Sequence, residues 1–369
     1  MKVLTVFGTR PEAIKMAPIV KELEKRKDIE SVVAVTGQHR EMLDQVLKIF
    51  DIKPDYDLNI FKPGQSLTGI TVNAMLGLEK VLIEIKPDVL LIQGDTTTVF
   101  SGSLAAFYQK IKIGHVEAGL RSGNLYSPFP EEANRKLTGV LANFHFAPTE
   151  SNRENLLKEG YDDSKIYITG NTVIDALKYA VKDDYHFDEE LLNNIDYKNK
   201  KVVLLTSHRR ENIGQPMENI FKAVLDVVHE HDDVEVIFPV HLNPKVREIA
   251  DKFFKGEDRI HMIEPLDYLP FSNLMNRVYL VVTDSGGIQE EAPALGKPVL
   301  VVREETERME GVIANTAKLV GTKYENIYKG FTELIENKEK YNEMAHAVNP
   351  YGDGTAAKKI IDILENELA

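Results

Sequence analysis

Four titratable side chains occupy positions where α/β proteins usually carry out chemistry. Asp95 in "GDTTT", Glu117 in "HVEAGLRS" and His208 in "SHRREN" each follow a predicted strand, and Glu131 in "FPEEANR" opens a helical pattern. Taken singly, each could be a helix cap, a first-turn glutamate or a structural histidine. Active sites of open parallel sheets, however, lie at the carboxyl ends of the strands, and carboxylates in a shared site have their pKa values pushed apart. Together these residues predict general acid–base chemistry.

The stretch "DSGGIQEEA", residues 284–292, predicts a turn that could bind a nucleotide. It follows the apolar run "VYLVVT", so we expect a strand, a glycine turn and then a helix. Asp284 or Ser285 could cap that helix, and Gly286 and Gly287 would let a phosphate approach its backbone N–H groups. Glu291 could accept hydrogen bonds from a ribose diol. A tight structural turn with solvated glutamates explains the same pattern about equally well.

Other features narrow the choice of cofactor. Arg10 and Lys15 in "GTRPEAIKMAP" begin a predicted helix and could hold phosphate oxygens, although a solvated lysine on a helix face is the usual case. The glycine fingerprints of NAD-binding folds and of P-loops are missing. No His-x-x-x-His or similar ligand spacing occurs, so a metal site ranks below acid–base chemistry. We therefore expect neither NAD nor a metal ion as cofactor.

Length and composition set broader limits. A chain of 369 residues exceeds what one hydrophobic core usually supports, which predicts two domains. The net charge of -13 disfavours binding to nucleic acid or to an anionic membrane. The absence of cysteine, of a signal-peptide pattern and of an apolar run that could span a bilayer suits a cytoplasmic protein.

Short β-branched runs alternate with amphipathic stretches, which is typical of βα units and a parallel sheet. The predicted strands are "KVLTVF", "SVVAVT", "DVLLIQ", "IKIGHV" and "FHFAP" in the first half, and "KVVLLT", "VEVIFPV", "RIHMI", "YLVVT" and "KPVLVV" in the second. We expect a first domain over residues 1–170 and a second over 171–354, with a polar surface segment at 181–201. An amphipathic helix at 355–369 should complete the first domain.

The two halves also resemble each other. "VLTVFGTRPEA" corresponds to "VVLLTSHRREN", and "LLIQGDTTT" corresponds to "LVVTDSGGI". These pairs predict equivalent βα turns in two similar domains. If the domains face each other, the four turns would line one cleft.

The motifs together are similar to those of a known family. "FGTRPEAIKMAP", "GQHREML", "GDTTT", "HVEAGLRS", "PEEANR", "HRREN", "TDSGGIQEEAP", "TER" and "NPYGDG" resemble, in order from Val3 to the end, the non-hydrolysing UDP-N-acetylglucosamine 2-epimerases of bacteria. The resemblance implies the GT-B fold, two Rossmann-like domains facing a cleft. It also implies a cytoplasmic homodimer that interconverts UDP-GlcNAc and UDP-ManNAc at the second sugar carbon and supplies cell-surface polysaccharide or teichoic acid linkage units.

The resemblance further assigns roles to residues. The hydrogen on the second carbon has no neighbouring carbonyl, so without NAD the remaining route is elimination of UDP, a glycal intermediate and re-addition. The family's acid–base set matches Asp95, Glu117, Glu131 and His208. The departing diphosphate would be stabilised by cations and by the glycine turn, the uracil would be held by one aromatic residue and by backbone, and the ribose by one glutamate. The cations would be Arg10, Lys15 and Arg308, and the glycine turn consists of Ser285, Gly286 and Gly287. Phe271 and the backbone near Leu266 would hold the uracil, and Glu291 would hold the ribose.

Two features depart from the family pattern. Gln38, His39, Arg210 and His241 match residues implicated in a second nucleotide-sugar site of regulated relatives, but Gly64 stands where those relatives carry arginine. We therefore expect weak or absent activation by substrate. Met309 follows Arg308 in "TERMEG", where the family usually has a proline that would stiffen the loop.

Three alternatives stay open at this point. A GT-B glycosyltransferase would share the fold and the grip on UDP but would move the sugar to an acceptor. A hydrolysing epimerase would release ManNAc and UDP. A non-catalytic nucleotide-sugar sensor would keep Ser285 and Glu291 but would not need the four acid–base residues, whose joint presence argues against it.

Overall fold

The computed structural model describes residues 1–37, 40–60, 62 and 64–368. The chain forms two compact units, Met1–Tyr179 with Tyr351–Ala369, and Ala180–Pro350. The division falls after Tyr179 rather than close to Gly170. The helix α7 (Thr172–Ala180) explains this, because the Asp175 carboxylate accepts hydrogen bonds from the backbone N–H groups of Ala356 and Ala357 at 3.2 and 2.9 Å. The segment after Gly170 is thus tied to the C-terminal helix of the first unit.

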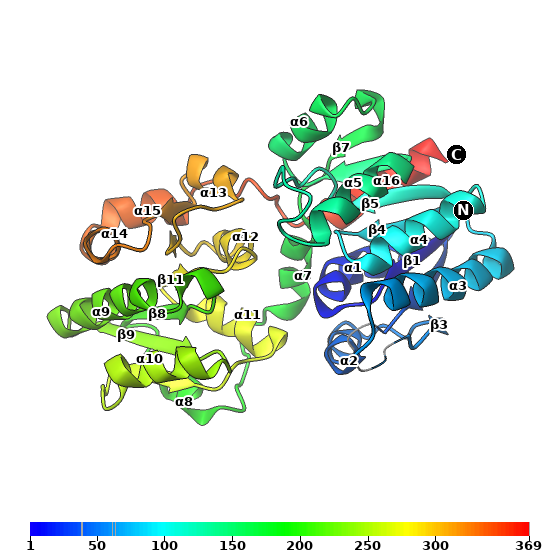
Figure 1. Cartoon of the computed structure of the whole chain (residues 1–369). Helices are drawn as coiled ribbons and strands as arrows, with labels where there is room; N and C mark the ends of the chain where they lie inside the picture. Colours follow the sequence, from blue (N-terminus) through cyan, green and yellow to red (C-terminus); the bar gives the residue numbers. More distant parts are fainter. Residues whose placement is uncertain (38–39, 61, 63, 369) are drawn as a thin grey trace. The chain divides into compact units, whose positions relative to one another are not determined.

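The first unit is built on a seven-stranded parallel sheet in the order β3-β2-β1-β4-β5-β6-β7 (Figure 1). Helices α1, α2 and α16 lie together, and α3, α4 and α5 form a second group. The strands are β1 (Lys2–Phe7), β2 (Glu30–Val35), β3 (Tyr56–Asp57), β4 (Val89–Gln93), β5 (Lys112–Val116), β6 (Phe144–Ala147) and β7 (Ile166–Ile168). The helices are α1 (Arg10–Leu23), α2 (Arg40–Ile49), α3 (Leu67–Ile85), α4 (Thr97–Tyr108), α5 (Glu131–Leu141), α6 (Glu150–Lys158), α7 and α16 (Ala356–Glu367).

The central strands of this sheet are buried on both faces, as their continuous apolar runs predict. All five residues of β4 are buried, and in β1 only Lys2 is partly exposed. The register places Val3 beside Val89 and Thr5 beside Leu91, so β1 and β4 end at the same edge of the sheet. The turns that follow these two strands are therefore neighbours.

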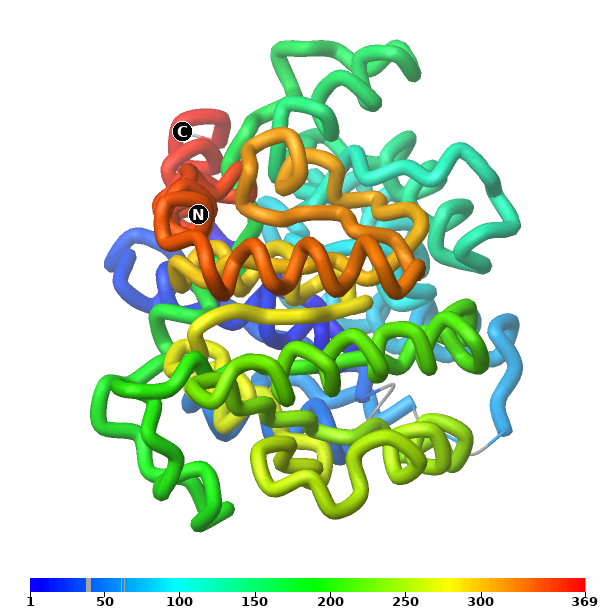
Figure 2. The backbone as a smooth tube through the Cα atoms, turned by 90° about the vertical axis from the view of Figure 1, so that its left-hand side faces the viewer, coloured from blue at the N-terminus to red at the C-terminus, as the bar shows by residue number. Residues whose placement is uncertain are grey.

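The second unit repeats this plan with a six-stranded parallel sheet in the order β10-β9-β8-β11-β12-β13. Helix α9 packs against α10 on one side and α14 on the other. Figure 2 shows α9 in green and α14 in dark orange running next to each other. The strands are β8 (Lys201–Thr206), β9 (Val234–Pro239), β10 (Ile260–Ile263), β11 (Leu280–Thr283), β12 (Val299–Val301) and β13 (Ala317–Leu319). The helices are α8 (Glu190–Asn194), α9 (Gln215–Glu230), α10 (Pro244–Phe254), α11 (Tyr268–Arg277), α12 (Ile288–Ala294), α13 (Met309–Ile313), α14 (Tyr324–Glu336) and α15 (Lys338–Ala345).

Aromatic packing stabilises the core of the second unit. Phe221 of α9 contacts Phe238 of β9 and Phe254 of α10, with ring centroids 5.3 and 4.9 Å apart. All three side chains are fully buried. Burial of each such ring contributes about 1.5–3 kcal/mol relative to an exposed one. The sheet of this unit is therefore held firmly against its helices.

The ten predicted strands all occur, and the three strands that we did not predict lie toward the sheet edges. β3, β7 and β13 have only two or three residues each, too few for a periodic pattern. The segment 181–201 is largely polar and exposed, as predicted, but it contains α8 and buries Phe187 and Leu192. The predicted C-terminal helix is α16, which is held by ion pairs from Arg26, in the turn that follows α1, to Asp362 and Glu365. Within the described part of the chain, every helix is too short or too polar to cross a membrane.

Candidate active site

The turn after β1 is organised by a buried glutamate. Glu12 Oε2 accepts hydrogen bonds from the backbone N–H groups of Gly8 and Thr9 at 3.0 and 2.7 Å, and Glu12 Oε1 accepts one from Thr96 Oγ1 at 2.6 Å. Burial raises the pKa of Glu12, while these hydrogen bonds act to lower it. A side chain at Gly8 could not be accommodated, because its Cβ would lie 2.0 Å from Thr36 Oγ1. The turns after β1 and β4 are thereby joined.

Asp95 follows β4 and is held by an arginine of α5. Arg135 donates to Asp95 Oδ2 through Nε at 2.8 Å and through Nη2 at 2.7 Å. Asn134 Nδ2 also donates to the Asp95 backbone carbonyl at 2.9 Å. The start of α5 is therefore fixed beside the turn after β4, and the Asp95 carboxylate, about one quarter exposed, keeps access to solvent.

Glu117 follows β5, which is the neighbour of β4 in the sheet. Its carboxylate forms an ion pair with Lys15 of α1 and accepts a hydrogen bond from Gln93 Nε2 at 2.5 Å. Its backbone has φ 63°, a left-handed conformation that is unfavourable for a residue with a side chain. Lys15, which we predicted as a phosphate ligand, thus lies against a predicted catalytic carboxylate.

The two glutamates at the start of α5 have different environments. Glu132 is fully buried, accepts hydrogen bonds from the backbone N–H groups of Ser122 and Gly123, and pairs with Arg135 at 3.2 Å. Burial acts to raise the Glu132 pKa, but these hydrogen bonds and Arg135 lower it overall. Glu131, the first residue of the helix, is half-buried. Glu132 is therefore occupied structurally, which leaves Glu131 as the candidate for chemistry.

His115 of the same motif has a structural environment. It is buried within β5, and its Nε2 atom lies 2.7 Å from the Gly94 carbonyl oxygen. Burial lowers its pKa to about 4, so the ring is neutral near pH 7. Arg121 is also occupied, because it forms a bidentate ion pair with Glu159. Neither residue belongs to the predicted catalytic set.

In the second unit, Asp284 organises the turn after β8. It is fully buried, and its Oδ2 atom accepts hydrogen bonds from Ser207 Oγ, His208 N, Arg209 N and Asn212 Nδ2 at 2.9–3.1 Å. The suggestion that Asp284 or Ser285 caps the following helix is wrong. Helix α12 begins at Ile288 with Gly287 as its N-cap, and no side chain bonds to that cap. Four donors from the neighbouring turn compete successfully for the Asp284 carboxylate.

His208, the predicted catalytic residue of this unit, lies between Asp284 and His241. Its Nδ1 atom is 3.5 Å from Asp284 Oδ1, and its ring stacks on that of His241 with centroids 5.4 Å apart and planes at 16°. Burial lowers the His208 pKa, and the charges of His241 and Arg209 act in the same direction, while Asp284 raises it. A neutral imidazole can accept a proton, and the protonated ring can return it, which suits general acid–base catalysis.

Arg308 lies directly over the glycine turn. A Cβ atom added to Gly286 would be 3.0 Å from Arg308 Nη1, so the guanidinium lies in close contact with the turn backbone. Arg308 Nε donates to Glu290 at 2.9 Å, and its backbone N–H donates to Thr306 Oγ1 at 3.1 Å. Thr306 in turn donates to Gln289 Oε1 at 2.7 Å. The loop that carries Arg308 is therefore fixed to α12, and Met309 follows as the first residue of α13.

The residues predicted to bind the nucleoside also belong to this unit. Glu291 Oε1 is 3.3 Å from the position that a Cβ atom would take on Gly287. Its charge also contributes, after burial, to raising the pKa of Tyr268 in α11 well above the usual value. Leu266 precedes α11 and Phe271 lies in its first turn, both half-buried. The Glu291 carboxylate thus lies beside the glycine turn and within electrostatic reach of α11, the helix that carries Phe271.

The remaining predicted residues are placed as follows. Arg10 is the first residue of α1 and is half-buried. Gln38 and His39 lie outside the described residues, whereas Arg210 and His241 are exposed. Gly64 has φ 73° and open space around it. Within the described ranges, no group of three histidine, aspartate or glutamate side chains could hold a metal ion.

Sequence reasoning missed several residues that support the site. Glu12 could have been found, because T-x-x-E before an apolar run is a capping-box pattern. Arg135 lies inside the motif "PEEANR", but nothing in its spacing indicated a contact with Asp95. Gln93 ends a buried strand, and its contact with Glu117 depends on the pairing of β4 with β5. These contacts join residues distant in sequence.

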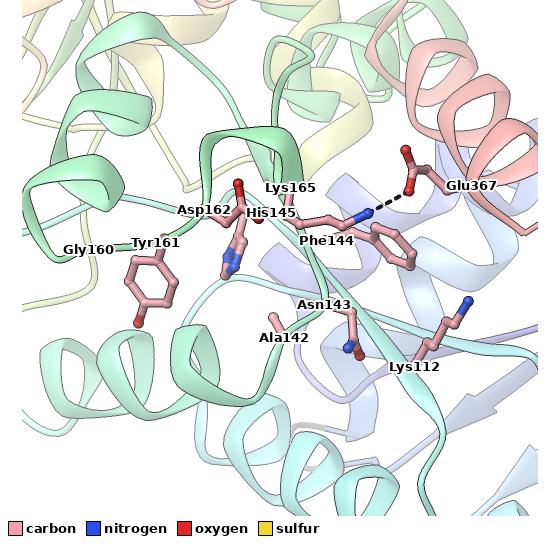
Figure 3. Close-up of a pocket in the computed structure, with 10 residues that line it drawn as sticks. All are labelled: Lys112, Ala142, Asn143, Phe144, His145, Gly160, Tyr161, Asp162, Lys165 and Glu367. Atoms are coloured by element: carbon pink, nitrogen blue, oxygen red, sulfur yellow. Dashed lines mark hydrogen bonds and ion pairs between the residues drawn. The ribbon is translucent and has the colours of Figure 1, made fainter.

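A separate cavity of about 450 Å³ lies at the opposite edge of the first sheet (Figure 3). It is lined by Lys112 and Phe144 at the starts of β5 and β6 and by Lys165 before β7. Lys165 pairs with Glu367 of α16 at 2.7 Å. Asp95 and Glu117 instead follow the carboxyl ends of their strands, so this cavity is not part of the candidate active site.

Comparison with known proteins agrees with this geometry. A family model described as UDP-N-acetylglucosamine 2-epimerase matches residues 21–365. The chain is 56% identical over 364 residues to a UDP-N-acetylglucosamine 2-epimerase of Bacillus subtilis, with 99% of this chain and 95% of the relative covered. It is 55% identical over 371 residues to that of Escherichia coli, with 99% of both chains covered.

A solved structure gives the same result. The crystal structure of UDP-GlcNAc 2-epimerase from Neisseria meningitidis bound to UDP-GlcNAc has a TM-score of 0.88 and 53% identity, and the match covers 99% of this chain and 100% of that chain. The predicted α/β class with two Rossmann-like parallel sheets, that of the GT-B fold, is confirmed. Since the family model and the relatives match almost the whole chain, the chain belongs to the UDP-N-acetylglucosamine 2-epimerase family.

Proposed function

We propose that this chain reversibly converts UDP-GlcNAc to UDP-ManNAc by elimination and re-addition of UDP, with no NAD, metal ion or net hydrolysis. The carrying observation is the arrangement of three carboxylates in the first unit. Asp95 and Glu117 follow adjacent strands, each beside a cation, and Glu131 begins the helix that Asn134 and Arg135 fix to Asp95. Such a set can exchange a proton with a sugar carbon and stabilise the charge that develops beside it.

The proposed steps balance as follows. The bond between the anomeric carbon and the UDP oxygen breaks, and its electron pair leaves with UDP. A carboxylate removes the proton from the second carbon, and the C–H electron pair forms the double bond of the glycal. Return of a proton to the opposite face and re-addition of UDP to the anomeric carbon give the epimer. Asp95, Glu117, Glu131 and His208 are the groups that we assign to these proton transfers.

The second unit has the groups needed to retain the leaving group. Arg308 lies over Gly286 and is oriented by Glu290, so a cation is fixed at a turn where backbone can approach a ligand closely. Glu291 beside Gly287 would accept hydrogen bonds from the ribose hydroxyls, and Phe271 and the backbone near Leu266 would contact the uracil. Arg10 and Lys15 of the first unit would add charge stabilisation. That the two units close over one cleft is part of the proposal.

The direct test is incubation of the purified protein with UDP-GlcNAc, followed by proton NMR. We expect UDP-ManNAc and UDP-GlcNAc to reach equilibrium, with EDTA and removal of NAD having no effect. Free ManNAc with stoichiometric UDP would show a hydrolysing enzyme, and reaction only with an added acceptor would show a glycosyltransferase. Binding of UDP-GlcNAc without conversion would show a sensor.

We also propose that the chain is a homodimer joined through the helices α3, α4 and α5. These neighbouring helices expose large apolar side chains, and apolar side chains that gather on one surface are typical of interaction sites. They are Val72, Leu76, Ile83, Phe107, Tyr108, Leu137 and Val140. A symmetric pair could bury the same patch on both chains.

Light scattering during size exclusion tests the dimer. We expect a measured mass of twice the chain mass for the wild type. For the double variant Leu76→Glu, Val140→Glu we expect the mass of a single chain. Val348, which is 85% exposed in the second unit, provides the control Val348→Glu, which should not change the mass. A monomeric wild type would contradict the proposal. From the family resemblance we further propose that the protein acts in the cytoplasm and supplies ManNAc for surface polysaccharide.

A further inference from the structure

We infer that Asp284 is a positioning residue for the proposed epimerisation: its Oδ1 atom fixes the ring orientation and the tautomer of His208. The inference rests on the proposed function for its catalytic meaning, although its structural part can be measured without substrate. Asp284 does not need to touch the sugar. It would act through His208 by keeping the proton on Nδ1, which leaves the lone pair on Nε2 for proton transfer.

The two carboxylate oxygens of Asp284 have different surroundings. Oδ2 accepts four hydrogen bonds from the turn after β8. Oδ1 is buried and accepts no hydrogen bond within the described part of the chain. A buried carboxylate oxygen without a donor is costly, so a nearby donor should be present in the working enzyme. The His208 Nδ1 atom, at 3.5 Å, is placed to be that donor.

The surroundings of His208 restrict how its ring can move. The His208 backbone N–H donates to Asp284 Oδ2 at 2.9 Å, so one carboxylate fixes the backbone and faces the ring of the same residue. The stacked ring of His241 covers one face of the imidazole. A small rotation would shorten 3.5 Å to the usual hydrogen-bond length of about 2.9 Å, and catalytic hydrogen bonds are often longer before substrate binds.

The ionisable groups facing His208 give the expected direction of a pH effect. Asp284 raises the His208 pKa, whereas burial, His241 and Arg209 lower it. Removing the Asp284 charge should therefore lower the His208 pKa further. In a profile of kcat/KM against pH, a limb that reports His208 should move to lower pH.

The informative variant is Asp284→Asn. Its amide oxygen can take the place of Oδ2 and keep the four hydrogen bonds of the turn. Its NH2 group would then face His208 Nδ1 as a donor and would favour the tautomer with the proton on Nε2. Ser207→Ala is the matched control, because it removes one hydrogen bond to Oδ2, 3.1 Å long, and leaves the side facing His208 intact.

The experiment is nitrogen-15 NMR of histidine-labelled protein without substrate, with His208→Asn for assignment, together with kcat and kcat/KM as functions of pH. We expect the Nδ1–H tautomer in the wild type and in Ser207→Ala, and the Nε2–H tautomer in Asp284→Asn. Turnover should fall about 100-fold or more in Asp284→Asn, the scale of lost acid–base catalysis, and less than about fivefold in Ser207→Ala.

An unchanged tautomer in Asp284→Asn, or an equal loss of turnover in both variants, would overturn the inference. If Asp284→Asn does not fold, the wild type alone decides, because a dominant Nε2–H tautomer would contradict a donor at Nδ1. A wild type with the expected tautomer but no epimerase activity would instead refute the proposed function, so the two failures can be told apart.

Discussion

The two units use the same sheet order but connect their central turns in opposite directions. β1 and β4 in the first unit hold the places of β8 and β11 in the second. In the first unit, Glu12 at the start of α1 binds the turn after β1 and accepts a hydrogen bond from Thr96 in the turn after β4. In the second, Asp284 from the turn after β11 reaches the backbone of the turn after β8. A buried carboxylate joins the paired turns in both, but it comes from different strands.

This difference decides which side chains are left for chemistry. Gly94 directly follows β4, in the place that Asp284 takes after β11. Because Glu12 already joins the turns of the first unit, Asp95 is not used for that purpose and forms an ion pair with Arg135 instead. In the second unit Asp284 is buried and joins the two turns. His208 faces its carboxylate, and Arg308 contacts the glycine turn that follows it. The comparison predicts proton transfer mainly in the first unit and retention of UDP in the second.

Removal of the acid–base groups should have the largest effect. We expect Asp95→Asn, Glu117→Gln, Glu131→Gln and His208→Asn each to lower turnover about 100-fold or more, because each removes a group assigned to proton transfer. Steady-state rates, with circular dichroism as the folding check, measure this. Glu132→Gln is a useful contrast, because it weakens buried hydrogen bonds and should therefore lower the free energy of unfolding more than it lowers turnover. Near-normal turnover in any of the four would remove that residue from the catalytic set.

Acid should destabilise the first unit more than the second. Burial lowers the pKa of His115 and of His145, on adjacent strands, to about 4. Their unfolded forms protonate near pH 6.5, so the stability that they contribute is present above pH 6.5 and is lost as the pH falls toward 4. At pH 5 the loss is about 2 kcal/mol for each histidine. Hydrogen exchange at pH 7 and pH 5 should show protection falling in β5 and β6, and an equal fall in β8 and β11 would contradict the comparison.

Loss of the cation over the glycine turn should affect retention of UDP. Arg308→Ala leaves Glu290 without its ion pair and should lower epimerisation about tenfold, consistent with loss of one charge-assisted contact of about 1.5 kcal/mol. Free UDP and glycal should also accumulate faster relative to epimer than in the wild type. A time course by NMR measures both products. A lower rate with an unchanged ratio of leakage to epimerisation would show that Arg308 does not hold the leaving group.

The smallest expected effect is at Met309. It is the first residue of α13, a position that suits proline because the N–H there has no intrahelical partner. Met309→Pro should stabilise the second unit by about 0.5–1 kcal/mol, because proline reduces the conformational entropy of the unfolded chain. Turnover should change little. Urea unfolding at equilibrium measures the difference. A loss of stability would mean that the loop carrying Arg308 cannot accept the proline geometry.

The sequence predicted the strand ends at which the candidate residues lie but not the contacts that each side chain makes there. The strands came from continuous apolar runs, and the repeated turn motifs predicted the equivalence of β1 with β8 and of β4 with β11, which the sheet orders confirm. The sequence offered no signal for the structural role of the neighbouring Glu132, because its contacts with Ser122 and Gly123 form only in the folded loop. The capping role given to Asp284 failed for a similar reason. Donors from a turn 76 residues earlier in the chain take its carboxylate, and no local pattern reports them.

The central claim is that a side chain removes the proton from the second sugar carbon while UDP departs. The most direct measurement is NMR of the reaction with UDP-GlcNAc in deuterium oxide. We predict deuterium at the second carbon, and at no other carbon, in both UDP-ManNAc and recovered UDP-GlcNAc, because an acidic side chain exchanges its proton with solvent before returning it. Retention of hydrogen at that carbon through many turnovers would contradict the roles given to Asp95, Glu117, Glu131 and His208.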